Sequence, residues 1–389
     1  MQVFAAACAC TIVCCAGAAS GSDVSVLLDA DTAMTATLSL DIDDDLAAVW
    51  LHAARETPLP PPCVANCNVA SDASEVTVKL VALTTTHGNA PAWVTCPDAK
   101  RLSNELQDFP PLACGGGGYL WGGFDPSRAP ASPSAAADML VVQTLAALHA
   151  PVRSRVIWVA IGALTNVAEA LRVRPDLASK IEMLVVMGGS LDGMLELNFA
   201  ADAAAARFVL ALPGLRRVLL PLELGKTVSV TTAHLDALAQ CVAAAPGPRR
   251  RFIAPHLPLL RRHAVVFGLL NPLLFGAEPD GPPIWERLAA ATRWRGAFHP
   301  WDVLAAAYVT DRALFGPLQC WNASIAHGAL TLSAERVPHA CSVHGDGGGL
   351  VGVPESVDGA RLAQLLVVRL CAVDAAAAAP VSTSGNGEL

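Results

Sequence analysis

Positive charge is scarce in this sequence. Its 389 residues include 26 Lys and Arg against 34 Asp and Glu, which gives a formal net charge of -8. The only dense basic run is Arg249–Arg251 with Arg261 and Arg262 following, and such a run is typical of a solvated helix face. Binding to a nucleic-acid backbone requires clustered Lys and Arg, so the composition argues against a nucleic acid as partner.

Three other signatures are missing. Beyond residue 20 no apolar run is long enough to span a bilayer, so no membrane-spanning segment is expected. The glycine-rich stretch CGGGGYLWGGF at 114–124 lacks the GK[ST] of a phosphate-binding loop and is interpreted either as a lid or as a plain surface loop. Cys63 and Cys67 have a metal-like spacing, but no second pair follows, so a zinc site is not expected.

The two ends of the chain differ in composition from the rest. Residues 1–20 form an uncharged apolar run that ends in small residues, as a secretory signal peptide does. No basic residue lies near Met1, so an anchor and a misassigned start are the alternatives. Residues 373–389 form a low-complexity tail that is expected to be disordered. We therefore predict one large domain over residues 24–372 between these two ends.

Cysteine usage agrees with secretion. Of 12 cysteines, four lie in the first 20 residues, so cleavage there would leave eight, an even number that suits disulfides in an oxidising compartment. Asn322-Ala323-Ser324 is a glycosylation sequon. The sequence thus predicts a secreted, extracellular glycoprotein and leaves its disulfide pairing open.

Short β-branched runs alternate with helical stretches along the chain. The segment 46–54 is expected to be a helix. The expected strands are 24–28, 75–83, 155–160, 183–187 and 217–222. This alternation predicts a single α/β domain with a doubly wound, mainly parallel (mixed) sheet and helices on both faces. Ligands of such sheets bind beyond the carboxyl ends of the strands, so polar residues at those ends are candidates for chemistry.

Residues 28–51 carry a dense group of acidic side chains after the first expected strand. The segment reads LDADTAMTATLSLDIDDDLAAVWL, and its aspartates are Asp29, Asp31, Asp41, Asp43, Asp44 and Asp45. A hard cation with oxygen ligands is the usual way to neutralise such a cluster, and calcium tolerates irregular carboxylate and carbonyl geometry better than magnesium does. The alternative is an acidic surface turn with helix-capping aspartates.

Four further segments follow in order at strand ends. They are TTTHGNA at 84–90, AIGALTNVAEAL at 160–171, VVMGGSLDGMLELNFAADAAAA at 185–206 and FHPWDVLAAAYV at 298–309. Together with the acidic cluster they resemble the inosine-uridine nucleoside hydrolase family. The resemblance covers residues 24–372 and implies a nucleoside hydrolase-like fold, a calcium-dependent N-glycosyl hydrolase of ribonucleosides (a purine or pyrimidine nucleosidase), and a homo-oligomer of two or four subunits.

The resemblance also implies roles for individual residues. The proposed ligands of the calcium ion are Asp31, Asp44, the backbone carbonyl of Thr165 and Asp302. Asp31 is also the expected general base that takes a proton from water. These side chains would act on a bond whose cleavage passes through an oxocarbenium-like state.

A second group of residues is expected to contact the nucleoside. The candidates for the ribose are Asp43, Asn89, Glu196 and Asn198. His299 is the candidate acid for the departing base, with a structural or surface histidine as the alternative. Trp301 is the candidate for stacking on the base, with a core aromatic as the alternative.

The chain departs from the family pattern at several places, including Leu197, which replaces a Phe of the family motif. Extra residues lie between Asp31 and Asp43, so Asp41 is an alternative to Asp31, and Asp45 is an alternative member of the following pair. Trp301 stands where the commoner motif has His. The segment 193–194 lacks an asparagine that common members use as a further ribose contact. Two other functions therefore stay open: hydrolysis of another N- or O-ribosyl compound, and calcium-stabilised nucleoside or ribose binding without turnover.

Overall fold

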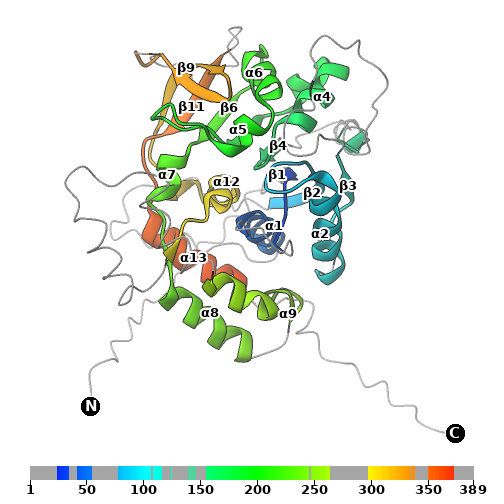
Figure 1. Ribbon diagram of the computed structural model, residues 1–389, viewed down its shortest axis with the longest axis vertical. Coiled ribbons are helices and arrows are strands. Elements are labelled where there is room, and N and C mark those ends of the chain that lie inside the picture. Colours follow the sequence, from blue (N-terminus) through cyan, green and yellow to red (C-terminus); the bar gives the residue numbers. More distant parts are fainter. Residues whose placement is uncertain are drawn as a thin grey trace, which may run out of the picture.

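A nine-stranded sheet organises the chain in the computed structural model (Figure 1). The residues described are 24–34, 42–54, 78–106, 108–115, 124, 140–141, 143–144, 155–244, 247–262, 297–333, 335–337 and 349–371. The predicted signal peptide, most of the glycine-rich stretch and the predicted tail lie outside these residues.

The sheet is mainly parallel. Its strands are β1 (Val24–Ala30), β2 (Val78–Thr85), β3 (Leu112–Cys114), β4 (Arg155–Ala160), β5 (Met183–Met187), β6 (Arg217–Leu220), β9 (Leu318–Ala326), β10 (Ala329–Leu332) and β11 (Leu350–Pro354). Their order is β10-β9-β11-β6-β5-β4-β1-β2-β3. In this order, every neighbouring pair from β11 through β6, β5, β4, β1 and β2 to β3 is parallel. At the other edge, β9 pairs antiparallel with both β11 and β10. A small second sheet joins β7 (Val230–Thr231) to β8 (Ala297–Phe298).

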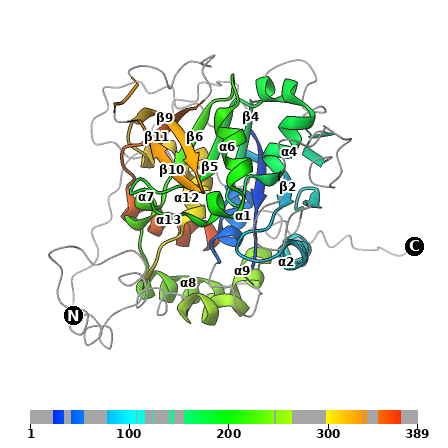
Figure 2. The same cartoon turned by 45° about the horizontal axis from the view of Figure 1, so that its top comes forward.

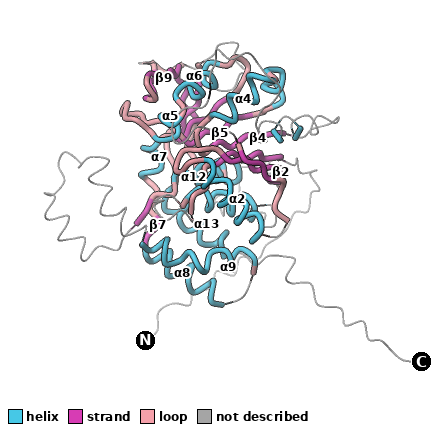
Figure 3. Tube along the Cα trace, turned by 45° about the vertical axis from the view of Figure 1, so that its right-hand side comes forward, coloured by secondary structure: helices cyan, strands magenta, loops and turns pink. Residues whose placement is uncertain are grey.

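Helices cover both faces of the large sheet. The α-helices are α1 (Asp43–Ala54), α2 (Ala92–Glu105), α4 (Thr165–Val173), α5 (Leu197–Ala201), α6 (Ala203–Ala211), α7 (Leu222–Lys226), α8 (Thr232–Ala244), α9 (Pro248–Ile253), α12 (Trp301–Thr310) and α13 (Gly359–Cys371). Figures 2 and 3 show α4 and α6 on one side of the strands and α12 and α13 on the other, and α1 packs against α12 and α13.

Strand β1 shows why both faces need a covering layer. All seven of its residues are buried, and successive side chains point to opposite faces. Val26 and Leu28 pack into the core under α1, α12 and α13, whereas Leu27 packs with Trp158 into the core under α4 and α6. A strand that is apolar on both sides is stable only inside such a sandwich, which confirms the predicted doubly wound α/β fold.

The strand order reverses between β1 and β4. Strands β2 and β3 follow β1 on one side, and β5 and β6 follow β4 on the other. The ladder continues past the strand ends, since Thr86 N donates to Ala30 O at 2.9 Å and Ile161 N donates to Asp29 O at 2.8 Å. The residues after β1, β2 and β4 are therefore neighbours at the topological switch point, where open α/β sheets bind their ligands.

Several expected boundaries shift in the structure. Helix α1 begins at Asp43 rather than at residue 46, and its first turn contains Asp43, Asp44 and Asp45. Negative side chains stabilise the amino end of a helix, so the acidic run belongs to the helix instead of preceding it. Strands β4 and β5 have the predicted bounds, while β2 continues to Thr85 and β6 ends at Leu220.

Two disulfides tie the outer elements together. Cys96–Cys114 joins α2 to the end of β3, and Cys241–Cys371 joins α8 to the last residue of α13. Cys320 is disulfide-bonded as well. The expectation of disulfides is confirmed for these cysteines. Among the described residues, no helix has the length and apolar character needed to cross a bilayer.

Candidate functional site

Two aspartates meet beyond the end of β1. Asp31 and Asp44 are 0% and 1% exposed, and Asp31 N donates to Asp44 Oδ1 at 3.0 Å. Asn89, which follows β2, connects both carboxylates: its backbone N donates to Asp31 Oδ2 at 2.6 Å and its Nδ2 donates to Asp44 Oδ2 at 2.8 Å. Three residues that the sequence predicted to act together are thus in direct contact.

Two glycines enclose the Asp31 carboxylate. A Cβ added to Gly88 would lie 2.1 Å from Asp31 Oδ2, and one added to Gly162 would lie 2.6 Å from Asp31 Oδ1. Gly88 also has a φ of +155°, which disfavours other residues. Glycine at the ends of β2 and β4 is therefore required for the carboxylate to fit between the two strand ends.

Asp302 lies beside the aspartates of α1. It occupies the first turn of α12, and its backbone N donates to Asp43 Oδ2 at 2.9 Å. Both side chains are buried, at 4% and 3% exposure. Residues 259 positions apart are therefore adjacent, because α12 packs along α1 on the same face of the sheet.

Asp45, the alternative member of the aspartate pair, belongs to a different environment. Burial raises its pKa well above the ordinary value, and the carboxylates of Asp98 and Asp44 add to this effect. Arg101 opposes it, with Nη2 3.7 Å from Asp45 Oδ1. Asp45 faces α2 and its Asp98–Arg101 pair, so the structure favours Asp44 as the residue that joins Asp31.

Thr165 begins α4 just after β4. Its hydroxyl donates to Asp202 Oδ2 at 2.7 Å, and the same oxygen accepts from Phe124 N at 2.9 Å. Asp202 Oδ1 caps α6 by accepting from Ala205 N at 3.0 Å. Burial lowers the pKa of His87, and the negative charge of Asp202 opposes this lowering. Sequence reasoning did not single out Asp202, although an aspartate before a helical run is a capping signal.

Glu196 and Asn198 hold the segment after β5. Glu196 Oε2 accepts from Gly189 N at 2.9 Å, and Oε1 accepts from Asn198 N at 2.8 Å. Asn198 Nδ2 donates to Ile161 O at 2.8 Å and to Met187 O at 3.2 Å. These bonds fix both side chains to the ends of β4 and β5.

His299 and Trp301 flank the amino end of α12. Their ring centroids are 5.4 Å apart. Trp301 Nε1 donates to Leu222 O at 3.2 Å, and a Cβ on Gly225 would lie 2.0 Å from the indole, so glycine there allows the ring to pack on α7. His299 Nδ1 lies 2.7 Å from Val228 O, and since a carbonyl only accepts, Nδ1 carries the proton. The pKa of His299 is lowered mainly by burial, and the positive charge of Lys226 lowers it further.

Contacts place most of the predicted residues in three groups. Asp31, Asp44 and Asn89 form the first with Asp43 and Asp302 alongside, Glu196 and Asn198 form the second, and His299 and Trp301 form the third. Thr165 contacts Asp202 instead. In the described part of the chain, no three or more His, Cys, Asp or Glu side chains are grouped so as to hold a metal ion. The oxygen-rich Asp31–Asp44 pair nevertheless has the donor chemistry of a hard-cation site, and the roles of its residues stay predictions.

A buried acidic group at the switch point of a doubly wound sheet occupies the place where α/β proteins of this class bind small molecules. The family described as inosine-uridine preferring nucleoside hydrolase matches residues 65–364. The chain belongs to this family, which confirms the resemblance inferred from the motifs. It is therefore an N-glycosyl hydrolase, a purine or pyrimidine nucleosidase.

Solved structures share the fold. A purine-preferring ribonucleoside hydrolase from Gardnerella vaginalis superposes with a TM-score of 0.62 at 17% identity, over 89% of this chain and 98% of that one. An inosine-guanosine nucleoside hydrolase gives 0.61 at 18% identity, over 90% and 99%. A plant nucleoside hydrolase gives 0.59 at 16% identity, over 90% and 99%. No curated protein matches the sequence.

Proposed function

We propose that this nucleosidase is calcium-dependent and releases a free base and ribose from ribonucleosides. The observation that carries the proposal is the Asp31–Asn89–Asp44 contact at the switch point, with Asp43 and Asp302 beside it. Buried carboxylates in contact are costly unless positive charge neutralises them, and irregular oxygen donors suit calcium best. Asp31, Asp44, Asp302 and the backbone carbonyl of Thr165 are the proposed ligands.

The residues of the chain would divide the work of hydrolysis. When bound, calcium would supply positive charge that polarises a water molecule and the ribose hydroxyls. Asp31, held between Gly88 and Gly162, would take the proton of the attacking water. Anionic side chains near the sugar would favour the positive charge that develops on its ring.

Four residues are proposed to hold the ribose. Asn89 uses both nitrogens on the aspartates, so its Oδ1 is the atom that would accept from a sugar hydroxyl. Asp43, Glu196 and Asn198 would contribute the remaining contacts. Glu196 and Asn198 are already fixed by the strand ends, so they lose little conformational freedom when the sugar binds.

Chelation tests the metal. Protein stripped with EGTA should lose at least about 100-fold in kcat/KM for inosine or uridine, because the ribose hydroxyls and the water would lose their polarising charge. Added calcium should restore the rate, and magnesium should restore less of it. Release of ribose by a reducing-sugar assay gives the measurement. Full activity in EGTA, with calcium absent by elemental analysis, would refute calcium dependence.

A leaving-group comparison tests His299. We propose that His299 donates a proton to the departing base, which requires the imidazolium form; its lowered pKa means that this form increases only as the pH falls below neutrality. H299Q should lower kcat for inosine by about 100-fold. The same variant should hydrolyse p-nitrophenyl riboside at the wild-type rate, since nitrophenolate departs without a proton. Equal losses on both substrates would indicate a structural role.

Secretion and self-association complete the proposal. The disulfides Cys96–Cys114 and Cys241–Cys371 support an oxidising compartment, because such bonds are rare in reducing ones. Asn322 and Ser324 of the sequon are both exposed on β9, where a glycan has room. We propose a secreted glycoprotein, and a homodimer or homotetramer as its assembly.

A further inference from the structure

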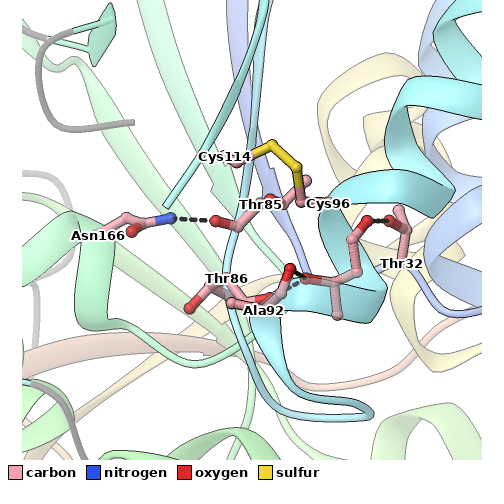
Figure 4. The surroundings of a disulfide bond; sticks show 8 residues. Thr32, Thr85, Thr86, Ala92, Cys96, Cys114 and Asn166 are labelled. Atoms are coloured by element: carbon pink, nitrogen blue, oxygen red, sulfur yellow. Dashed lines mark hydrogen bonds between the residues drawn. A yellow bond between two sulfur atoms is a disulfide. The ribbon is translucent and has the colours of Figure 1, made fainter. Parts of the chain in front are cut away.

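The Cys96–Cys114 disulfide lies next to the proposed site. Figure 4 shows it between α2 and the end of β3, beside Thr32, Thr85, Thr86 and Asn166. Both cysteines are partly exposed. The segment 86–91, which contains Asn89, connects β2 to α2 and so approaches the disulfide at its helical end.

Thr95, the neighbour of Cys96, joins α2 to two strand ends. Its Oγ1 donates to Thr86 O at 2.7 Å, which fixes the first residue after β2. Its carbonyl accepts from Thr32 Oγ1 at 3.0 Å, and Thr32 directly follows Asp31. Thr32 and Thr95 are both fully buried. A displacement of α2 at Cys96 would therefore be transmitted to the backbone on either side of the Asp31–Asn89 contact.

The other cysteine is connected to the same place. Gly115, which follows Cys114, donates its N–H to Thr85 O at 2.7 Å. Asn166 Nδ2 donates to the same carbonyl at 3.0 Å and to Asp29 Oδ1 at 2.7 Å. Thr85 is the last residue of β2, so the chain beside Cys114 fixes the start of the 86–91 segment. Thr95, beside Cys96, is bonded both to the first residue of this segment, Thr86, and to its last, since Thr95 N donates to Pro91 O at 3.2 Å.

We propose that the Cys96–Cys114 disulfide is a positioning cross-link for catalysis: it holds Asn89 in the geometry that joins Asp31 to Asp44. The proposal rests on the proposed function of these three residues. The second disulfide offers a natural comparison, because Cys241 lies in α8 and Cys371 ends α13, and neither helix carries a residue of the proposed site.

Two double variants separate positioning from stability. C241A/C371A removes a cross-link that spans 130 residues, whereas C96A/C114A removes one that spans 18. Because the chain entropy released on unfolding grows with the loop length, C241A/C371A should lower Tm more and leave kcat/KM unchanged. C96A/C114A should lower Tm less but reduce kcat/KM about 100-fold, since a small misplacement of reacting groups has a large effect.

Calcium titration of metal-free protein gives a readout independent of turnover. C96A/C114A should bind calcium about tenfold more weakly than wild type, and C241A/C371A should bind it equally well. If C96A/C114A does not fold, T95V tests the same connection, and kcat/KM should fall about tenfold without the Thr95–Thr86 bond. If C96A/C114A kept the wild-type kcat/KM and calcium affinity, the positioning role of the disulfide would be refuted while the proposed function would stand. The same result in T95V would have this meaning if only that variant folds. Calcium-independent wild-type activity would instead overturn the proposed function.

Discussion

Asp31→Asn should reduce kcat for ribonucleoside hydrolysis by about four orders of magnitude. A general base typically contributes about 100- to 10,000-fold, and this substitution also removes one charge from the proposed cation site. A 10,000-fold loss corresponds to about 5.5 kcal/mol of transition-state stabilisation. Asparagine keeps the size of the side chain, so it fits between Gly88 and Gly162 and the Oδ1 of the new amide still accepts from Asn89 N.

A steady-state assay of ribose release with saturating nucleoside provides the measurement. Asp176→Asn is the matched control, because Asp176 is an exposed aspartate paired with Arg174 on the surface, and its kcat should equal that of wild type. Far-UV circular dichroism and Tm establish that D31N is folded. A folded D31N with more than about a tenth of the wild-type kcat would assign the base to another residue.

The contact between Asp31 and Asn89 was accessible from the sequence because of a general property of parallel sheets. The carboxyl ends of β1 and β2 lie side by side, so polar residues that follow both strands meet whatever the details of packing. The same reasoning places Gly162 and Thr165 after β4. What it does not provide is the side-chain arrangement in which Asn89 contacts Asp31 and Asp44 at once.

Contacts that depend on packing were not predictable. Asp202 reaches Thr165 across 37 residues, and nothing in either local sequence indicates this pairing. The disulfide partners were equally hidden, because eight cysteines allow about 105 connectivities. Cys96 pairs with Cys114 because α2 lies beside β3, and this proximity appears only in the tertiary structure.

The edge of the sheet was missed for a different reason. Strand β9 is mostly half-buried or exposed, with only Cys320 and Ile325 buried, whereas an interior strand such as β1 is a continuous buried run. A search for continuous runs finds β4 and β5 with their exact bounds but passes over β9 and β10. The sequence predicted the helix that follows the aspartates, but not its start at Asp43. That start depends on the stabilisation of the helix amino end by the carboxylates.

Asp311→Ala should be strongly destabilising without touching the site. Arg369 of α13 pairs with Asp311 at 2.8 Å, and the two side chains are 3% and 7% exposed. The guanidinium also lies over the Trp50 ring at 4.7 Å, and Trp50 Nε1 donates to Thr310 Oγ1 at 2.8 Å. Removing Asp311 takes the paired carboxylate from a buried guanidinium, and breaking a buried ion pair in this way costs about 3–5 kcal/mol of unfolding free energy. We expect Tm to fall by about 5 °C, because the unfolding entropy of a chain of this length is large.

Two variants test whether burial causes this loss. Asp176→Ala removes an ion pair of the same 2.8 Å length whose side chains are 44% and 54% exposed, so its Tm should scarcely change. D311A/R369M removes the charge together with its partner and should recover most of the stability, since methionine packs against Trp50 without needing a counter-ion. Thermal unfolding followed by circular dichroism measures all three. If D311A and D176A lowered Tm equally, the Arg369–Asp311 pair would behave as a surface contact, and the core that joins α1, α12 and α13 would have to be held by apolar packing alone.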